Sequence, residues 1–205
     1  MGRTDANPGL HNPGRVGQWL VMKARRLFAG VAVAATDELR ATLAELQRAL
    51  RLEKIRWTRP EKLHLTVEFF GFVEPAQIPE LEGALARAAA GAPPFALQLG
   101  EPGLFGNLRH PRVLWLGVES AGLVELHART AAALRAAGWT PEARPYAPHL
   151  TLGRLDRLRE PDQFRARLEA AGGRPVPIQE VRELILYESL NGQYLPLARW
   201  PLAGE

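Results

Sequence analysis

The chain repeats one short motif, histidine–leucine–threonine followed by an aliphatic residue, in two separate segments. The first copy lies in residues 62–69 and the second in residues 147–154, and a proline precedes each motif, Pro60 or Pro148. Both segments have the apolar pattern of β-strands. Because side chains alternate between the two faces of a strand, the histidine and threonine share one face and the aliphatic residues the other. Each copy therefore predicts a strand that is apolar on one side and carries an imidazole and a hydroxyl on the other.

These side chains suit phosphodiester chemistry if the two strands face one another across a cleft. His64 and Thr66 share a face of the first strand, and His149 and Thr151 share a face of the second. One neutral imidazole can take a proton from an attacking water, while one imidazolium gives a proton to the leaving ribose oxygen. Both forms coexist near neutral pH because the reference pKa of histidine is about 6.5. A threonine hydroxyl can donate a hydrogen bond to a phosphoryl oxygen.

A single His-x-Thr in a strand would be interpreted as structural. Two copies in the same strand phase, in a chain with five histidines, favour the functional interpretation. The other histidines carry weaker signals. His11 lies in the N-terminal tail, and His110 lies in a loop, where it is a secondary candidate for a substrate contact. His127 lies on a predicted helix and is expected to be a structural or surface residue.

Other classes of site fit the sequence less well. A metal site needs three or more ligands, and neither motif has another histidine or an aspartate at metal-ligand spacing. The chain has no cysteine, which excludes disulfides, thiolate nucleophiles and cysteine zinc sites. Its two serines, Ser120 and Ser189, are not in a nucleophile-elbow context, and no glycine-rich phosphate loop occurs. We therefore expect no metal and no cofactor.

The remaining pattern predicts an α+β fold. The predicted strands cover residues 27–33, 63–70, 95–99, 113–118, 147–154, 181–187 and 194–200. The predicted helices cover residues 37–51, 75–90, 123–137 and 161–171. Strands in adjacent pairs with helices between them favour antiparallel sheets over a strictly alternating parallel sheet. Residues 103–111 are predicted to form a loop or hairpin connection, and Asn191-Gly192 is a strong hairpin turn signal.

The chain is predicted to contain one domain and a tail. Residues 1–25 are expected to be disordered, because turn signals repeat there without an apolar period, and Met22 is an alternative start. Residues 26–205 are expected to form the domain. No stretch approaches the roughly 20 apolar residues of a membrane-spanning helix, so a cytoplasmic location without membrane contact is expected. A monomer is the default, and the formal net charge of +4 favours an anionic partner.

These motifs together resemble the 2H phosphoesterase superfamily, and more closely its RNA 2′,3′-cyclic phosphodiesterases, also called 2′-5′ RNA ligases. The resemblance runs from Arg26 to Leu202. It rests on both His-Leu-Thr segments and on residues 26–28, 69–71, 112–117, 144–152 and 186–189. It implies a two-lobed, pseudo-symmetric α+β fold in which each lobe contributes one His-x-Thr to a central cleft.

The resemblance also implies an activity and roles for the motif residues. A terminal 2′,3′-cyclic phosphate is hydrolysed to a 2′-phosphate without metal, and the reverse reaction joins a 5′-hydroxyl to a cyclic phosphate in a 2′-5′ linkage. His64 is then the proton donor to the 3′ leaving oxygen, and His149 is the proton acceptor that activates water. Thr66 and Thr151 bind the phosphate. The expected partner is RNA with a 2′,3′-cyclic phosphate at its 3′ end, tRNA fragments among the candidates.

Two further residues are candidates for substrate binding. Arg154 lies just past the second motif, where the family often has an arginine near phosphate. An ideal strand would turn Arg154 away from His149, so this role requires a bend near Gly153. Tyr146 can stack on a base or belong to the core. The first motif has Phe69 where the second has Arg154, so the repeat is asymmetric there.

Three functions remain open on the sequence alone. The first is the cyclic phosphodiesterase of RNA ends. The second is an RNA-binding module without catalysis, whose affinity for RNA would depend on salt but not on the histidines. The third keeps the catalysis but acts on small cyclic nucleotides such as ADP-ribose cyclic phosphate. An assay with a nucleoside 2′,3′-cyclic monophosphate separates the first from the second.

Overall fold

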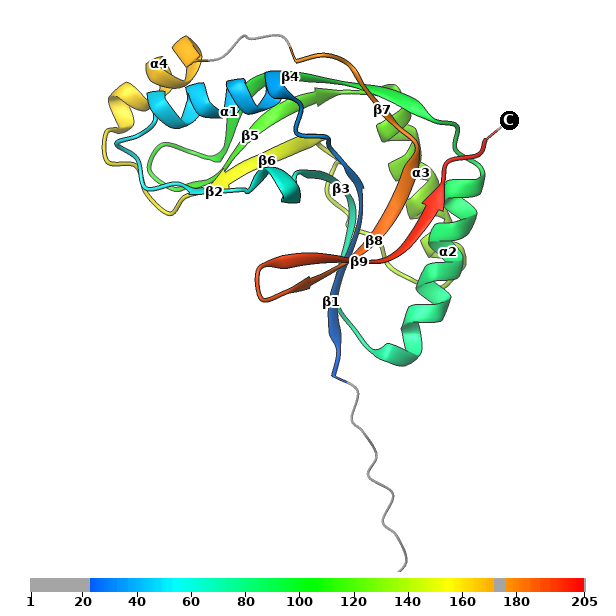
Figure 1. The fold of residues 1–205 in the computed structure, drawn as a ribbon. Coiled ribbons are helices and arrows are strands. Elements are labelled where there is room, and N and C mark those ends of the chain that lie inside the picture. The colour runs from blue at the N-terminus through cyan, green and yellow to red at the C-terminus, as the bar shows by residue number, and fades with distance from the viewer. Residues whose placement is uncertain (1–22, 172–175, 205) are drawn as a thin grey trace, which may run out of the picture.

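Two antiparallel sheets form the framework of the computed structural model, which describes residues 23–171 and 176–204 (Figure 1). The first sheet has the order β3 (His64–Val73), β1 (Arg25–Ala32), β8 (Glu183–Leu190) and β9 (Gln193–Pro201). The second sheet has the order β2 (Arg56–Trp57), β6 (His149–Arg154), β5 (Pro111–Glu119), β4 (Phe95–Gly106) and β7 (Gln179–Val181). This mixture of antiparallel sheets and helices confirms the predicted α+β class.

Helices cover one face of each sheet. The described α-helices are α1 (Asp37–Ala49), α2 (Ile78–Ala90), α3 (Ala121–Ala136) and α4 (Pro161–Ala171), with short 3₁₀ turns η1 (Pro60–Lys62) and η2 (Pro75–Gln77). In Figure 1, α1 and α4 lie over the second sheet, and α2 and α3 lie behind the first. The opposite sides of the sheets line the concave side of the curved molecule (Figure 1). None of the described helices is long and apolar enough to cross a membrane.

Local sequence explains where the helices begin and how they pack. Thr36 Oγ1 accepts a hydrogen bond from the Leu39 N–H at 3.3 Å, and Ser120 Oγ accepts one from Leu123 at 3.2 Å. Each side chain satisfies one of the unpaired N–H groups at a helix start. Buried leucines at helical spacing then follow in both α1 and α3, and they join one continuous hydrophobic core shared by the two sheets.

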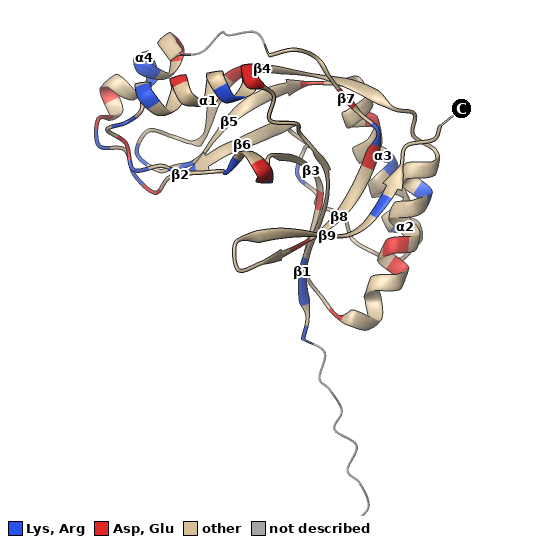
Figure 2. Ribbon diagram, viewed as in Figure 1, with Lys and Arg blue, Asp and Glu red and all other residues tan. Residues whose placement is uncertain are grey.

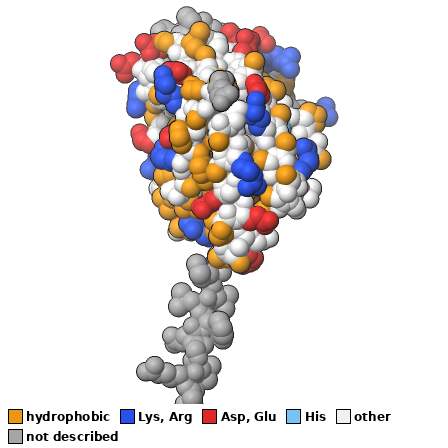
Figure 3. Space-filling model, turned by 90° about the vertical axis from the view of Figure 1, so that its right-hand side faces the viewer, with side chains coloured by type: hydrophobic (Ala, Val, Ile, Leu, Met, Phe, Trp, Pro, Cys, Tyr) orange, Lys and Arg blue, Asp and Glu red, His pale blue; other side chains and the backbone are white. Residues whose placement is uncertain are grey.

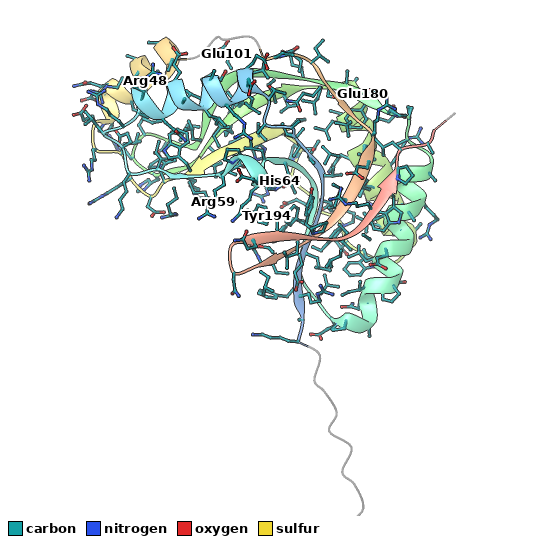
Figure 4. All side chains as sticks on the ribbon, viewed as in Figure 1. Arg48, Arg59, His64, Glu101, Glu180 and Tyr194 are labelled. Atoms are coloured by element: carbon teal, nitrogen blue, oxygen red, sulfur yellow. The ribbon has the colours of Figure 1, made fainter. Side chains whose placement is uncertain are left out.

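The helical face of the molecule carries a mixed surface. Figure 3 shows acidic and basic side chains interspersed with hydrophobic and neutral ones on the side that α2 and α3 occupy in Figure 1. Neither positive nor negative side chains dominate the face shown there. This face therefore lacks the excess of positive charge that would attract an anion. The His64 side chain of the first motif lies on the concave side instead (Figure 4).

The largest difference from the predicted elements is in β4. The sequence predicts a strand that ends at residue 99 and a loop or hairpin connection over 103–111. The hairpin connection is present, but it is limited to residues 107–110 because β4 continues to Gly106. Gly103 lies opposite Trp115 in the β4–β5 ladder, and a Cβ on Gly103 would be 2.2 Å from the indole ring. The glycine therefore makes room for a tryptophan that lies across the strand, and the predicted end of the strand at residue 99 was wrong.

Smaller differences concern the ends of elements. β6 begins at His149 instead of residue 147, because Pro148 has no N–H for the ladder. The strand predicted over 181–187 is divided at Arg182 between β7 and β8. The predicted tail falls mostly on residues 1–22, which lie outside the described residues, and Arg25 already belongs to β1. The hairpin turn expected at Asn191-Gly192 joins β8 and β9, with positive φ at both residues.

Gly30 provides a test of how tightly the first sheet is packed. It lies in β1 opposite Thr66, and a Cβ there would be 2.7 Å from the Leu65 carbonyl oxygen. We expect Gly30→Ala to lower the free energy of unfolding by about 1–3 kcal/mol in urea denaturation, because a backbone carbonyl in the ladder cannot move aside. Gly83→Ala is the control, since its Cβ would meet only the end of the Arg87 side chain at 3.6 Å. It should be neutral or stabilise helix α2 by about 0.5–1 kcal/mol, and equal effects of both substitutions would contradict this account.

Candidate active site

The two motifs lie on strands of different sheets that contact one another. β3 of the first sheet carries His64 and Thr66, and β6 of the second carries His149 and Thr151. In both strands the histidine and threonine are partly exposed, while the leucine between them is fully buried. The predicted division of each motif into an apolar face and a polar face is therefore confirmed.

Both strands contain the same irregularity at the third residue after the histidine. The pairing of β3 with β1 skips Val67, and the pairing of β6 with β5 skips Leu152. Each strand consequently buries two consecutive residues, and the next side chain returns to the polar face. That side chain is Phe69 in β3 and Arg154 in β6. The repeat is thus a repeat of backbone shape as well as of sequence.

The bend that the Arg154 role requires is therefore present, and Gly153 permits it. A Cβ on Gly153 would lie 2.6 Å from Ile55 Cγ2 and 3.2 Å from the Arg56 carbonyl oxygen. Only a glycine lets β6 approach β2 this closely. The bulge turns Arg154 to the same side as His149.

Both catalytic candidates have their imidazole rings fixed by the same hydrogen bond. His64 Nδ1 lies 2.8 Å from the Lys62 carbonyl oxygen, and His149 Nδ1 lies 2.8 Å from the Ala147 carbonyl oxygen. A carbonyl oxygen can only accept, so Nδ1 carries the proton and donates it in both rings. Nε2 is then the nitrogen that accepts a proton in the neutral ring and donates one in the imidazolium.

Aromatic side chains surround the ring of His64. Phe28 and Tyr194 each lie 4.8 Å from it between ring centroids, and Tyr194 meets it edge to face. Figure 4 shows His64 and Tyr194 close together on the concave side of the molecule. These contacts restrict the ring to one orientation.

Burial lowers the pKa of His64 below the ordinary histidine value. The hydrogen bond to the Lys62 carbonyl opposes this effect, and the positive charges of His149 and Arg154 add to it. Because β3 and β6 contact one another, charges on the second motif act on the histidine of the first. Burial therefore favours the neutral form of His64.

His149 is supported by an aromatic stack within the second sheet. The Phe105 ring meets it edge to face at 4.7 Å, and Phe105 in turn lies 5.2 Å from Trp115 between centroids. Trp115 is the residue that lies across Gly103. The unexpected extension of β4 therefore positions the second histidine.

Most of the predicted site residues line a cleft of ≈ 580 Å³. Thr66, Thr151, His149 and Arg154 all line it. His64 lines a different pocket of ≈ 240 Å³ instead. The link between the two is β3, on which His64 lies two residues before Thr66, a residue of the cleft.

Tyr146 has a structural role that the sequence left undecided. Its hydroxyl donates a hydrogen bond to the Thr66 carbonyl oxygen at 2.9 Å, and its ring stacks on His127 at 4.0 Å with an interplanar angle of 3°. Burial raises the pKa of Tyr146 above its usual value, so the hydroxyl remains a donor. The His127 ring covers one face of Tyr146, and stacking of a base on the other face stays a prediction.

Glu68 is a site residue that the sequence analysis missed. Simple alternation would place it on the polar face of β3, but the bulge at Val67 buries it, and its side chain is 2% exposed. Its Oε1 accepts a hydrogen bond from the Glu142 N–H at 3.1 Å, and its Oε2 lies 3.9 Å from His127 Nε2. Burial lowers the pKa of His127, and the Glu68 charge partly opposes this. Together with Tyr146, Glu68 ties the segment before the second motif to the first motif.

The cleft contains further residues that the sequence analysis did not select as site candidates. Phe69 presents an aromatic ring that is 43% exposed, and the Arg26 guanidinium lies 4.8 Å from its centroid. Arg112 also lines the cleft. Within residues 23–171 and 176–204, no three histidine, aspartate or glutamate side chains are grouped as metal ligands would be.

Comparison with known proteins assigns the chain to a family. The family model described as LigT like Phosphoesterase matches the chain twice, over residues 30–115 and over residues 116–193. The chain belongs to this phosphoesterase family. Each match contains one His-x-Thr motif, in agreement with the two lobes and the pseudo-symmetry that the sequence implied.

Named relatives and solved structures agree with this family. An RNA 2′,3′-cyclic phosphodiesterase of Geobacillus stearothermophilus is 32% identical over 191 residues, which are 89% of this chain but only 59% of that protein. One of Methanothermobacter thermautotrophicus is 33% identical over 146 residues, 70% of this chain and 77% of that protein. The crystal structure of E. coli LigT with 3′-AMP matches with a TM-score of 0.67 and 28% identity, covering 88% of this chain and 99% of that one.

The lowered pKa values of His64 and His127 predict a loss of stability in acid. The unfolded chain takes up these protons near pH 6.5, whereas the folded protein takes them up only at lower pH. The unfolded state therefore binds more protons in that window, and the free energy of unfolding should fall as the pH drops below about 6.5.

Urea denaturation at about pH 7.5 and about pH 5.5 measures this loss. His64→Asn should make it smaller, because the asparagine amide can still donate to the Lys62 carbonyl but takes up no proton in this range. An equal loss in the variant and in the wild type would contradict the effect of burial on His64.

Proposed function

We propose that this protein hydrolyses the 2′,3′-cyclic phosphate at the 3′ end of RNA to a 2′-phosphate. His64 and His149 act as an acid and base pair, without a metal. The observation that supports this most strongly is the matched orientation of the two imidazoles, each with Nδ1 hydrogen-bonded to the carbonyl two residues upstream. Two neighbouring strands thereby offer two equivalent Nε2 atoms for proton transfer on either side of a phosphate.

The reaction follows from these two nitrogens. His149 Nε2 takes a proton from a water molecule, whose oxygen attacks the phosphorus. The bond from phosphorus to the ribose 3′ oxygen then breaks, and His64 Nε2–H gives its proton to that oxygen. The products are a free 3′-hydroxyl and a 2′-phosphate, and the two histidines exchange protonation states, which solvent restores.

Three side chains of the cleft stabilise the charge that develops on the phosphoryl oxygens. Thr66 and Thr151 each lie two residues after a catalytic histidine and can donate hydroxyl hydrogen bonds there. Arg154 adds a guanidinium, which suits phosphate oxygens. The negative charge of the bound phosphate also favours the imidazolium form of His64, which burial by itself disfavours.

The comparisons support the substrate class. Relatives that carry the name RNA 2′,3′-cyclic phosphodiesterase match most of this chain, and the related LigT was crystallised with 3′-AMP, a nucleotide with a 3′-phosphate. Because this chain spans 59% of the length of the Geobacillus relative, the activity remains a proposal for this protein. RNA ends, tRNA fragments among them, are the proposed partners, and a monomeric state and a cytoplasmic location stay predictions.

Other reactions use the same site. By microscopic reversibility, the pair could join a 5′-hydroxyl to a cyclic phosphate and form a 2′-5′ linkage. Small cyclic nucleotides such as ADP-ribose cyclic phosphate are the alternative substrates. A non-catalytic RNA-binding role is disfavoured, because simple binding would not require two identically held imidazoles.

Replacement of either histidine tests the pair. We expect His64→Ala and His149→Ala each to lower turnover of adenosine 2′,3′-cyclic phosphate by about two to four powers of ten. Arg87→Ala, on the exposed side of α2, is the control and should keep full activity. Activity should also survive EDTA. Full activity in either histidine variant would refute the pair.

A modified substrate tests which histidine is the acid. An analogue with sulfur in place of the bridging 3′ oxygen has a leaving group that needs little protonation. We expect this analogue to restore most of the activity of His64→Ala and little of that of His149→Ala. The opposite pattern would reverse the two roles while leaving the acid and base pair intact.

A further inference from the structure

A basic trough continues from the cleft past Arg154. It is a pocket of ≈ 460 Å³ at the end of the second sheet where β2, β5 and β6 meet, and its lining residues are Arg56, His110, Pro111, Arg112, Arg154, Leu155 and Asp156. Arg112 and Arg154 line both this trough and the cleft, so the two spaces adjoin. Figure 2 shows basic segments around β2 and the turn between β4 and β5.

The positive charge of the trough is only partly neutralised. Arg56 forms a two-pronged ion pair with Asp156, at 2.7 and 3.2 Å. Neither Arg112 nor Arg154 takes part in an ion pair within residues 23–171 and 176–204. Three guanidinium groups therefore face one carboxylate, which leaves an excess of positive charge beside the reacting phosphate.

The backbone that carries these side chains is held in place before any ligand binds. The Arg112 carbonyl oxygen accepts a hydrogen bond from the Leu155 N–H at 3.1 Å, which joins the start of β5 to the end of β6. In the turn before Arg112, Asn107 Oδ1 accepts hydrogen bonds from the N–H groups of Arg109 and His110, both at 2.9 Å. A preorganised site loses less entropy on binding than a flexible one.

We infer that this trough binds a second phosphate of the substrate, the one on the 5′ side of the terminal nucleotide. Guanidinium forks match phosphate oxygens, and Arg112 and Arg154 connect the two phosphate positions. The inference rests on the proposed function and narrows its substrate class. The protein acts on RNA ends and 5′-phosphorylated nucleotides in preference to nucleoside 2′,3′-cyclic phosphates.

Two small substrates isolate the second phosphate. Adenosine 2′,3′-cyclic phosphate has only the reacting phosphate, and its 5′-phosphorylated form adds one more. The wild-type protein should hydrolyse the 5′-phosphorylated compound with a kcat/KM about tenfold higher, which corresponds to one charge-assisted contact. This ratio should decrease as KCl is added, because salt screens an exposed ionic contact.

Three variants locate the effect in the trough. Arg112→Gln should bring the ratio of the two kcat/KM values close to one. Asp156→Asn should raise the ratio severalfold, because it removes the carboxylate that occupies Arg56. Arg87→Gln, an exposed arginine on α2, is the matched control and should keep the wild-type ratio.

The results separate this inference from the proposed function. A wild-type ratio of one, or a ratio that Arg112→Gln leaves unchanged, overturns the second phosphate site while the phosphodiesterase stands. A wild-type protein that hydrolyses neither compound overturns both. A ratio that falls in Arg112→Gln and rises in Asp156→Asn is the pattern that only a phosphate site in the trough produces.

Discussion

One hydrogen bond, made twice, underlies the chemistry that we propose for this protein. In both motifs the imidazole Nδ1 donates to the carbonyl oxygen two residues upstream, which fixes the tautomer and leaves Nε2 for proton transfer. The rest of the structure holds these rings in position. Phe28 and Tyr194 pack around His64, and Phe105 packs against His149. The interface between the sheets then brings the two strands into contact, so that each sheet supplies half of the proposed site.

Both motif strands contain the same β-bulge, but the residues that follow the two bulges have different roles. The bulges at Val67 and Leu152 are equivalent, but the residues that follow them differ. In the first sheet, the buried Glu68 accepts a hydrogen bond from the Glu142 N–H, which belongs to the segment before the second motif. This bond connects the two motifs. In the second sheet, a glycine allows close packing and Arg154 reaches the cleft. The pseudo-symmetry of the fold thus extends to backbone shape, whereas the side chains after the bulges have a structural role in the first sheet and a proposed phosphate-binding role in the second.

The sequence predicted the fold class, and it predicted which face of each motif strand carries the histidine and the threonine, because both depend on local patterns. Strand alternation was enough to place each histidine beside its threonine, and the requirement for a bend at Gly153 followed from the same rule. What escaped prediction depends on contacts between distant strands. Gly103 resembled a loop residue until Trp115 was seen to lie across it, and Glu68 resembled a surface residue until the bulge buried it. The trough arises only where three strands from separate parts of the chain meet.

The central claim is that the Nε2 atoms of His64 and His149 transfer protons on opposite sides of one phosphorus atom. A crystal structure of the protein with a slowly hydrolysed adenosine 2′,3′-cyclic phosphorothioate tests this most directly. We expect the Nε2 atoms of His64 and His149 to lie within hydrogen-bond reach, about 2.7–3.2 Å, of the 3′ oxygen and of a water in line with it, on opposite sides of the same phosphorus. A bound phosphorothioate that contacts only one of the two imidazoles would contradict the account.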